Sequence, residues 1–135
     1  MSRALSIGVL LAVFTGTAVA ANGIAVKRGE DAMLYGNCVP SLVAVNGSAQ
    51  VIDFLQVDVV VALRGGQERT VELRSGYREG IARPIAPGAS APLRQQLDLS
   101  PLLGAACAAI ASHRVARTVC EAGGRDCAAA VTVQP

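Results

Sequence analysis

The sequence predicts an all-β domain, an antiparallel sandwich of two sheets with about seven strands. Short apolar segments with period-two alternation recur along the chain, and turn signals separate them every 8–12 residues or so. No alternation of strand and helix patterns occurs, which argues against a parallel sheet. Trp is absent and aromatic residues make up only 3% of the chain, so the core must be aliphatic.

The clearest strand covers residues 54–63, in which every second residue is apolar: Leu55, Val57, Val59, Val61 and Leu63. Val60 and Ala62 interrupt the polar row, so we expect its later half to be covered on both faces. Residues 64–67 contain two adjacent glycines and predict a tight hairpin turn. Residues 68–74 then return as a half-exposed strand, because charged side chains mix with Thr, Val and Leu.

The other expected elements are shorter. Ser100 and Pro101 suit the start of a helix, and Leu102, Ala106 and Ile110 are spaced by four, so one short helical turn is allowed within 101–111. The remaining strands are expected at residues 24–26, 32–35, 38–45 and 93–99, in a segment that ends at Cys120, and at 127–133. A short edge strand is also allowed at 81–85.

The N-terminus has the three parts of a secretory signal. Arg3 supplies a positive charge, residues 4–14 form an uncharged apolar run, and residues 18–20 offer the small side chains of a cleavage site. This run is shorter than the roughly 20 apolar residues that a membrane span needs. We therefore expect residues 1–20 to be a cleaved signal peptide, residues 21–135 to be one domain, and no membrane span.

Four cysteines follow this signal: Cys38, Cys107, Cys120 and Cys127. In an exported chain they predict two disulfides and a periplasmic or extracellular location. Four half-cystines allow three pairings. We favour Cys38 with Cys107, and Cys120 with Cys127 across a hairpin at 122–125.

No residue pattern points to catalysis, a metal or a cofactor. His113 is the single histidine, with Ser112 and Asp98 as its nearest candidate partners, and no nucleophile-elbow motif occurs. The closest cysteine pair has six residues between its members, too many for a structural zinc site. The shortage of aromatic residues also argues against binding of single-stranded nucleic acid. We expect a protein that is not an enzyme, with His113 a half-exposed strand residue.

Residues 75–92 are rich in Gly and Pro and form a long connection for a compact domain. Such segments often carry function, and Tyr and Arg are common in protein-binding hot spots. A solvated loop without a partner is the alternative interpretation. If the loop binds a protein, its candidate surface is Tyr77, Arg78, Glu79 and Arg83.

The layout of the chain carries one resemblance. A signal peptide precedes a cysteine strand at Tyr35-Gly36-Asn37-Cys38, a long aliphatic strand runs into a glycine turn, and further cysteines follow late in the chain. In this layout the chain resembles small secreted bacterial fibronectin-III-like proteins of the interleukin-receptor-mimic type. The resemblance implies an Ig-like, fibronectin-III-like sandwich, a homodimer formed by strand exchange and a protein-binding role, with no catalytic residues.

These observations predict an exported, non-enzymatic binding or structural module that acts through a sheet edge or the 75–92 loop. Its partner is a protein of unknown identity. The alternative is an inhibitor of an extracellular enzyme that presents an exposed loop, in which Arg78-Glu79 is the bond offered to a protease. A hydrolase or small-ligand carrier ranks last, because no site supports it.

Overall fold

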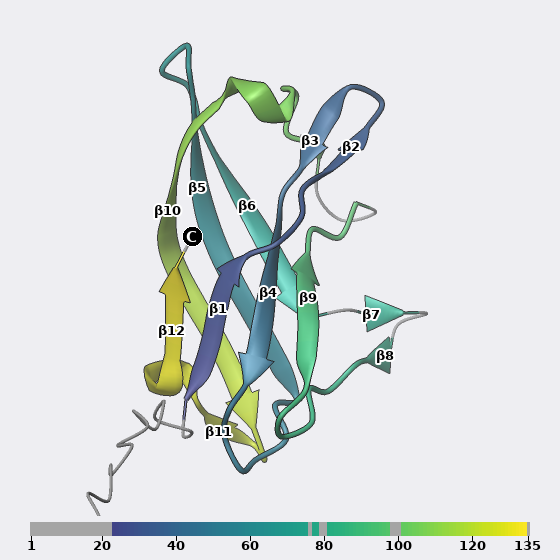
Figure 1. Cartoon of the computed structure of the whole chain (residues 1–135), viewed down its shortest axis with the longest axis vertical. Helices are drawn as coiled ribbons and strands as arrows, with labels where there is room; N and C mark the ends of the chain where they lie inside the picture. Colours follow the sequence, from purple (N-terminus) through teal and green to yellow (C-terminus); the bar gives the residue numbers. More distant parts are fainter. Residues whose placement is uncertain (1–22, 76, 79–80, 98–100, 135) are drawn as a thin grey trace, which may run out of the picture.

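The computed structural model describes residues 23–75, 77–78, 81–97 and 101–134. Eight strands form one sheet in the order β11-β10-β5-β6-β9-β4-β1-β12. The sheet curls so that β5, β6 and β10 lie behind β1, β4 and β9 (Figure 1). The all-β prediction is confirmed at this level. Within the described residues no helix is long and apolar enough to cross a membrane.

The main sheet contains β1 (Ile24–Arg28), β4 (Ser41–Asn46), β5 (Phe54–Leu63), β6 (Glu68–Ser75), β9 (Ser90–Arg94), β10 (Ile110–Ala122), β11 (Arg125–Asp126) and β12 (Val131–Gln134). Two small sheets pair β2 (Ala32–Leu34) with β3 (Asn37–Val39), and β7 (Tyr77–Arg78) with β8 (Ile81–Ala82). Two short 3-10 turns, η1 (Cys107–Ala109) and η2 (Ala128–Ala130), complete the described elements. The structure therefore has more strands than the expected seven.

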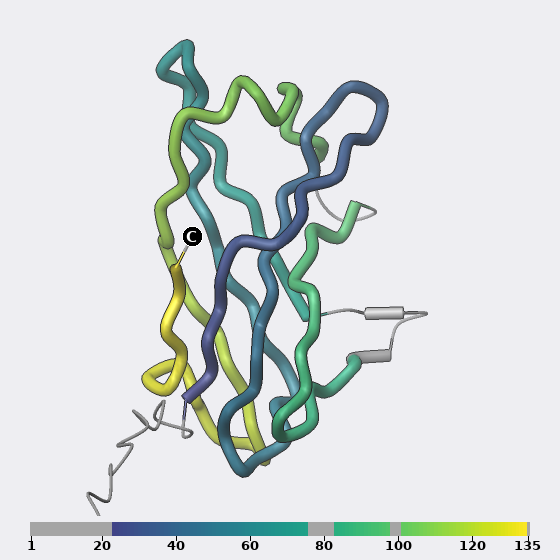
Figure 2. The backbone as a smooth tube through the Cα atoms, in the orientation of Figure 1, coloured from purple at the N-terminus to yellow at the C-terminus, as the bar shows by residue number. Residues whose placement is uncertain are grey.

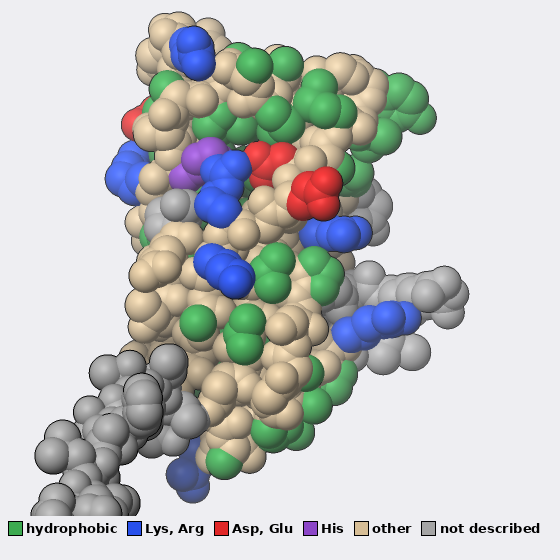
Figure 3. Space-filling model, viewed as in Figure 1, with side chains coloured by type: hydrophobic (Ala, Val, Ile, Leu, Met, Phe, Trp, Pro, Cys, Tyr) green, Lys and Arg blue, Asp and Glu red, His purple; other side chains and the backbone are tan. Residues whose placement is uncertain are grey.

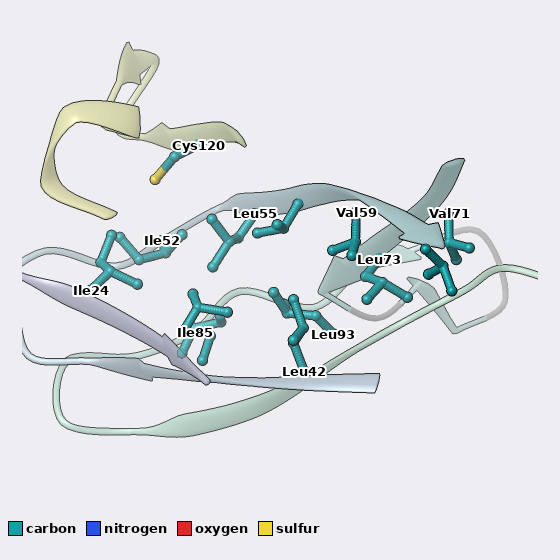
Figure 4. Packing of buried hydrophobic residues seen from close by; sticks show 14 of the residues in the cluster. Ile24, Leu42, Ile52, Leu55, Val59, Val71, Leu73, Ile85, Leu93 and Cys120 are labelled. Atoms are coloured by element: carbon teal, nitrogen blue, oxygen red, sulfur yellow. The ribbon is translucent and has the colours of Figure 1, made fainter. Parts of the chain in front are cut away.

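The inner face of β5 forms the centre of the core. Leu55, Val57, Val59 and Val61 are each at most 1% exposed. Across the core they face side chains from β4 and β9, with Leu42 and Leu93 among them (Figure 4). Burial of each such side chain contributes roughly 1.5–3 kcal/mol. The period-two pattern in the sequence thus marks the strand around which the sheet curls.

The outer face of β5 differs from the expectation. Its early half is the more covered, because Gln56 and Asp58 are buried while Val60 stays partly exposed. Two arginines from neighbouring strands cover these polar groups. Arg74 Nε donates to Gln56 Oε1 at 2.7 Å, and Arg117 Nε donates to Asp58 Oδ2 at 2.9 Å. Hydrogen bonds satisfy the buried polar atoms, which is why they are tolerated here.

The β5–β6 hairpin is confirmed. Leu63 N donates to Gln67 O at 2.8 Å, and Gly66 accepts a φ of 87° that other residues rarely adopt. The expected strand at 38–45 is divided into β3 and β4, with Pro40 between them. The short helical turn allowed within 101–111 is present only as η1.

The strand expected at 93–99 is present as β9, which begins earlier and ends at Arg94, and residues 98–99 lie outside the described residues. Its partner β4 begins at Ser41, paired with Arg94, and the residue before it is Pro40. Because proline has no N–H to donate, the ladder between these strands ends there. The alternation of apolar and polar residues continues in the sequence beyond Arg94. β4, however, has no further residue with which a longer β9 could pair.

The last predicted strand, 127–133, is present only in its second half, as β12 (Val131–Gln134). Only β11 returns along β10, and after η2 the chain pairs as β12 with β1 in parallel. Val131 and Val133 pack against the core from this position. The sheet is therefore not wholly antiparallel, and its last strand β12 lies beside β10, the second strand from the other end (Figures 1 and 2).

Both expected disulfides are present. Cys38 pairs with Cys107 over 69 residues of sequence, and Cys120 pairs with Cys127 over 7. The first ties β3 to η1, and the second closes the β10–β11 hairpin. The two bonds join very different lengths of chain, and their contributions to stability should differ accordingly.

Removal of the long disulfide should cost more stability than removal of the short one. In the chain-entropy picture, the double variant Cys38→Ala/Cys107→Ala loses about 4 kcal/mol and Cys120→Ala/Cys127→Ala about 2.5 kcal/mol. Denaturant unfolding of both variants beside the oxidised protein measures the difference. Equal losses, or a larger loss for the short bond, would contradict this ranking.

Candidate functional site

The β2–β3 hairpin extends beyond the curled sheet at one end of the molecule (Figure 1). Leu34 pairs with Asn37, so Tyr35 and Gly36 form a two-residue turn. Their φ angles are 49° and 77°. Such a turn needs positive φ at both positions, and Asn-Gly is its preferred sequence. Tyr35 occupies a conformation that a bulky residue rarely adopts, and its side chain is 89% exposed.

The hairpin is fixed to the rest of the fold at its base. Cys38 is fully buried, forms the disulfide to Cys107, and its N–H donates to Ala105 O at 2.7 Å. The tube in Figure 2 shows the segment before β10 passing beside this hairpin. Met33 lies next to the disulfide, with its Sδ 3.4 Å from Cys107 Sγ, and is 54% exposed. A rigid anchor thus presents two large side chains to solvent.

A groove of about 300 Å³ runs beside the hairpin. Its apolar lining comes from β2, β3 and the segment after β9, and Leu97 is among the exposed large hydrophobic residues. Glu30 and Arg94 supply its charged groups. Figure 3 shows hydrophobic side chains grouped at the end of the molecule where β2 and β3 lie. We call this end, defined by Met33, Tyr35 and Leu97, the hairpin end.

The sequence did not single out this surface. Tyr35-Gly36 contains a turn glycine, but the residue before it is not one that favours positive φ, so no type of turn was predicted. The exposure of Met33 also has no local signal, because a methionine in a short strand resembles a core residue. A strand followed by Tyr-Gly and a cysteine was the available clue.

The predicted surface in residues 75–92 is only partly described. Tyr77 and Arg78 form β7, which pairs with β8 and lies outside the main sheet (Figure 1). Arg83 follows β8 and is exposed. Glu79 lies outside the described residues.

The second half of this segment is not a free loop. Ile85 is buried and exchanges two backbone hydrogen bonds with Ile52, at 2.8 and 3.0 Å. Its carbonyl also accepts from Asn46 Nδ2 at 3.0 Å. Strand β9 then begins at Ser90. The expected long connection over 75–92 is therefore wrong in its second half, and the short strand allowed at 81–85 is present as β8 and the bridge at Ile85.

His113 lies on β10 and contacts a charged pair from β1 and the turn that follows. Arg28 Nη1 lies 2.6 Å from His113 Nδ1 and also contacts Nε2, while Arg28 Nη2 bonds Asp31 Oδ2 at 2.6 Å. Figure 3 shows the histidine beside a basic side chain, with acidic groups close by. These contacts connect β1 to β10 at Arg28, one residue beyond the part of β1 that pairs with β12.

Burial lowers the pKa of His113, and the positive charge of Arg28 lowers it further, while Asp31 opposes the change. A neutral imidazole accepts a hydrogen bond from the guanidinium, whereas a protonated one is repelled by it. Ser112 is the neighbour of His113 on the same strand, so its side chain points to the opposite face of β10. Asp98 lies outside the described residues. The contacts of His113 are those of a structural histidine.

The described residues contain one cluster with the composition of a metal site: Asp31, Cys38 and Cys107. Both sulfurs are bonded to each other, so neither is a thiolate that could coordinate a metal. Asp31 instead accepts the N–H of Ser41 at 3.1 Å and pairs with Arg28. These contacts give the cluster a structural role.

Comparison with known proteins gives one informative match. No family model matches the chain, and no curated protein matches it. The solved structure of IrmA from Escherichia coli is similar, with a TM-score of 0.55 and 12% sequence identity, over 83% of this chain and 91% of that chain. At this identity the likeness shows the fold alone. It supports the fold part of the resemblance to small bacterial proteins of that type.

The pKa of His113 predicts how stability depends on pH. The unfolded chain binds a proton near the ordinary pKa of about 6.5, before the folded chain does, so stability falls as pH drops through this value toward the lowered folded pKa. Unfolding titrations between pH 7.5 and 5 should show this loss, with no further loss from His113 below its folded pKa. His113→Gln should have a shallower dependence. Identical pH profiles for the two proteins would contradict the assignment.

Proposed function

We propose that the chain is an exported, non-enzymatic module that binds a protein partner through the hairpin end. The observation that carries this proposal is Tyr35, a solvent-exposed aromatic ring at a backbone position that favours asparagine or glycine. Strained residues concentrate at functional sites. Tyr is also enriched among the residues that dominate binding energy.

The surroundings of Tyr35 support the proposal. The Cys38–Cys107 disulfide fixes the base of the hairpin, so little conformational freedom is lost when a partner binds. Two disulfides also fit an oxidising periplasmic or extracellular location. The proposed export signal is residues 1–20, and the proposed fold family is the fibronectin-III-like sandwich, with the likeness to IrmA as support.

Two further parts of the proposal were already expected from the sequence: a homodimer and a second binding surface. A homodimer would form by exchange of β12, which follows the short η2 turn and pairs only with β1. The segment with Tyr77, Arg78, Glu79 and Arg83 stays a second candidate surface. No observation within the described chain favours the inhibitor alternative, which depends on the bond after Arg78.

Site-specific cross-linking tests the hairpin end. A photoreactive phenylalanine analogue at position 35 of the oxidised chain should form a discrete adduct in periplasmic or extracellular extract of the cells that make it. The matched control carries the analogue at Val51, an exposed residue between β4 and β5 at the opposite end. Once the adduct is identified, Tyr35→Ala should weaken binding of that partner by tenfold or more, as expected for a hot spot.

The result that overturns the proposal is equal labelling from positions 35 and 51, or unchanged affinity in Tyr35→Ala and Met33→Ala. A Gly-Ser linker in place of residues 77–82 tests the second surface in the same assay. This replacement keeps Ser75, whose Oγ accepts the N–H of Leu55, and keeps buried Ile85. Light scattering of the oxidised protein separates an exchanged dimer from a monomer.

A further inference from the structure

Within the described part of the chain, strand β6 has one side without a strand neighbour for most of its length. It pairs with β5 from Glu68 to Arg74, but with β9 only at Arg74 and Ser75. β9 ends at Arg94, and among the described residues no other strand takes its place beside Glu68–Leu73. An unpaired edge of this kind can accept an added strand.

The register shows which backbone groups lie on this edge. Leu63 N donates to Gln67 O, which makes Leu63 and Gln67 a hydrogen-bonded pair. Antiparallel pairs alternate, and the β5–β6 register has no shift. The N–H and C=O groups of Thr70 and Glu72 therefore point away from β5.

A groove of about 350 Å³ lies against this edge. Val71 and Leu103 are its buried apolar residues, and Leu102 and Pro101 extend the apolar lining. The edge therefore combines backbone groups that can form a ladder with a pocket for a side chain. This is the arrangement by which strand addition gains both affinity and specificity.

Gln95 is an independent sign of a missing partner in this groove. Gln95 lines both this groove and the groove beside the hairpin, and the residue is 8% exposed. Nε2 donates to Pro101 O at 2.7 Å, but the buried Oε1 has no hydrogen-bond partner in the described structure. Buried acceptors are almost always satisfied. A donor group of an occupant of the groove would satisfy this one.

The charge of the groove is unbalanced. Glu72 pairs with Arg74, whereas Arg69 donates only to Glu68 O and Gln67 Oε1, at 3.1 and 3.4 Å. No described carboxylate forms an ion pair with Arg69. A complementary occupant therefore carries an acidic residue.

We propose that the edge of β6 binds an extended acidic peptide of a protein partner as an added antiparallel strand. This inference rests on the proposed function, because it specifies how the module engages its partner. The peptide continues the line of β9, and its backbone N–H and C=O groups bond those of Thr70 and Glu72. A small aliphatic side chain covers Val71 and Leu103, and a carboxylate two residues later pairs with Arg69.

The probe is the blocked peptide Thr-Val-Thr-Asp-Thr, in which Val faces Val71 and Asp faces Arg69. Titration into the ¹⁵N-labelled oxidised protein should give saturable shifts at the amides of Thr70 and Glu72. Thr70→Pro removes an N–H that faces away from β5, so it should weaken binding at least tenfold while the β5–β6 ladder persists. Thr70→Val keeps the N–H and should bind like the original protein.

A charge exchange tests the same site without proline. Arg69→Glu should lose the acidic peptide and gain a peptide with Lys in place of Asp, each by about tenfold. If Thr70→Pro fails to fold, this pair of measurements decides. Absent shifts at the β6 edge, or equal binding to both peptides before and after the exchange, would overturn the proposal. Cross-linking from position 35 is scored separately, so the failure of this inference is distinguishable from failure of the proposed function.

Discussion

The aliphatic row on the inner face of β5 is the interaction on which the rest of the structure depends. With three aromatic side chains after residue 20, each buried residue contributes a small apolar area. The row must therefore be enclosed on every side. β6 and β10 extend the sheet on either edge of β5, and the curl brings β4 and β9 over its inner face (Figure 4). The parallel pair of β12 with β1 and the Arg28–His113 contact then close the remaining side.

This closed core does not require the hairpin end. β2 and β3 pair only with each other, and their contribution to the buried cluster is Cys38. The disulfide to Cys107 nevertheless holds them firmly in place. The hairpin end thus lies outside the core, although a disulfide anchors it and it contains a strained tyrosine. Gln95, whose Oε1 is unsatisfied, lines both the groove beside the hairpin and the groove beside the β6 edge.

The sequence predicted the elements that local chemistry determines. Alternation located β5, and two glycines located its hairpin. The four cysteines predicted two disulfides, and the pairing that we favoured among three is the one present. It could not predict elements that depend on distant neighbours. The end of β9 depends on Pro40, about fifty residues earlier, and the position of β12 depends on the free side of β1.

The candidate site was less predictable than the fold. Exposure of Met33 and Tyr35 depends on the hairpin leaving the sheet, and the β6 edge depends on where β9 ends. Neither the exposure of these two side chains nor the end of β9 produces a periodic pattern in the sequence. The predicted surface around Tyr77 rested on composition alone, and the structure replaced half of that loop with the Ile52–Ile85 bridge and β9.

The measurement that tests the central claim most directly is the unfolding free energy of Tyr35→Asn. The claim is that Tyr35 is present for recognition and not for the fold. This substitution creates an Asn-Gly turn, which suits the positive φ angles of residues 35 and 36. Relief of the strain should raise stability by about 1 kcal/mol. A loss of stability would show that the ring supports the fold, and would contradict the account.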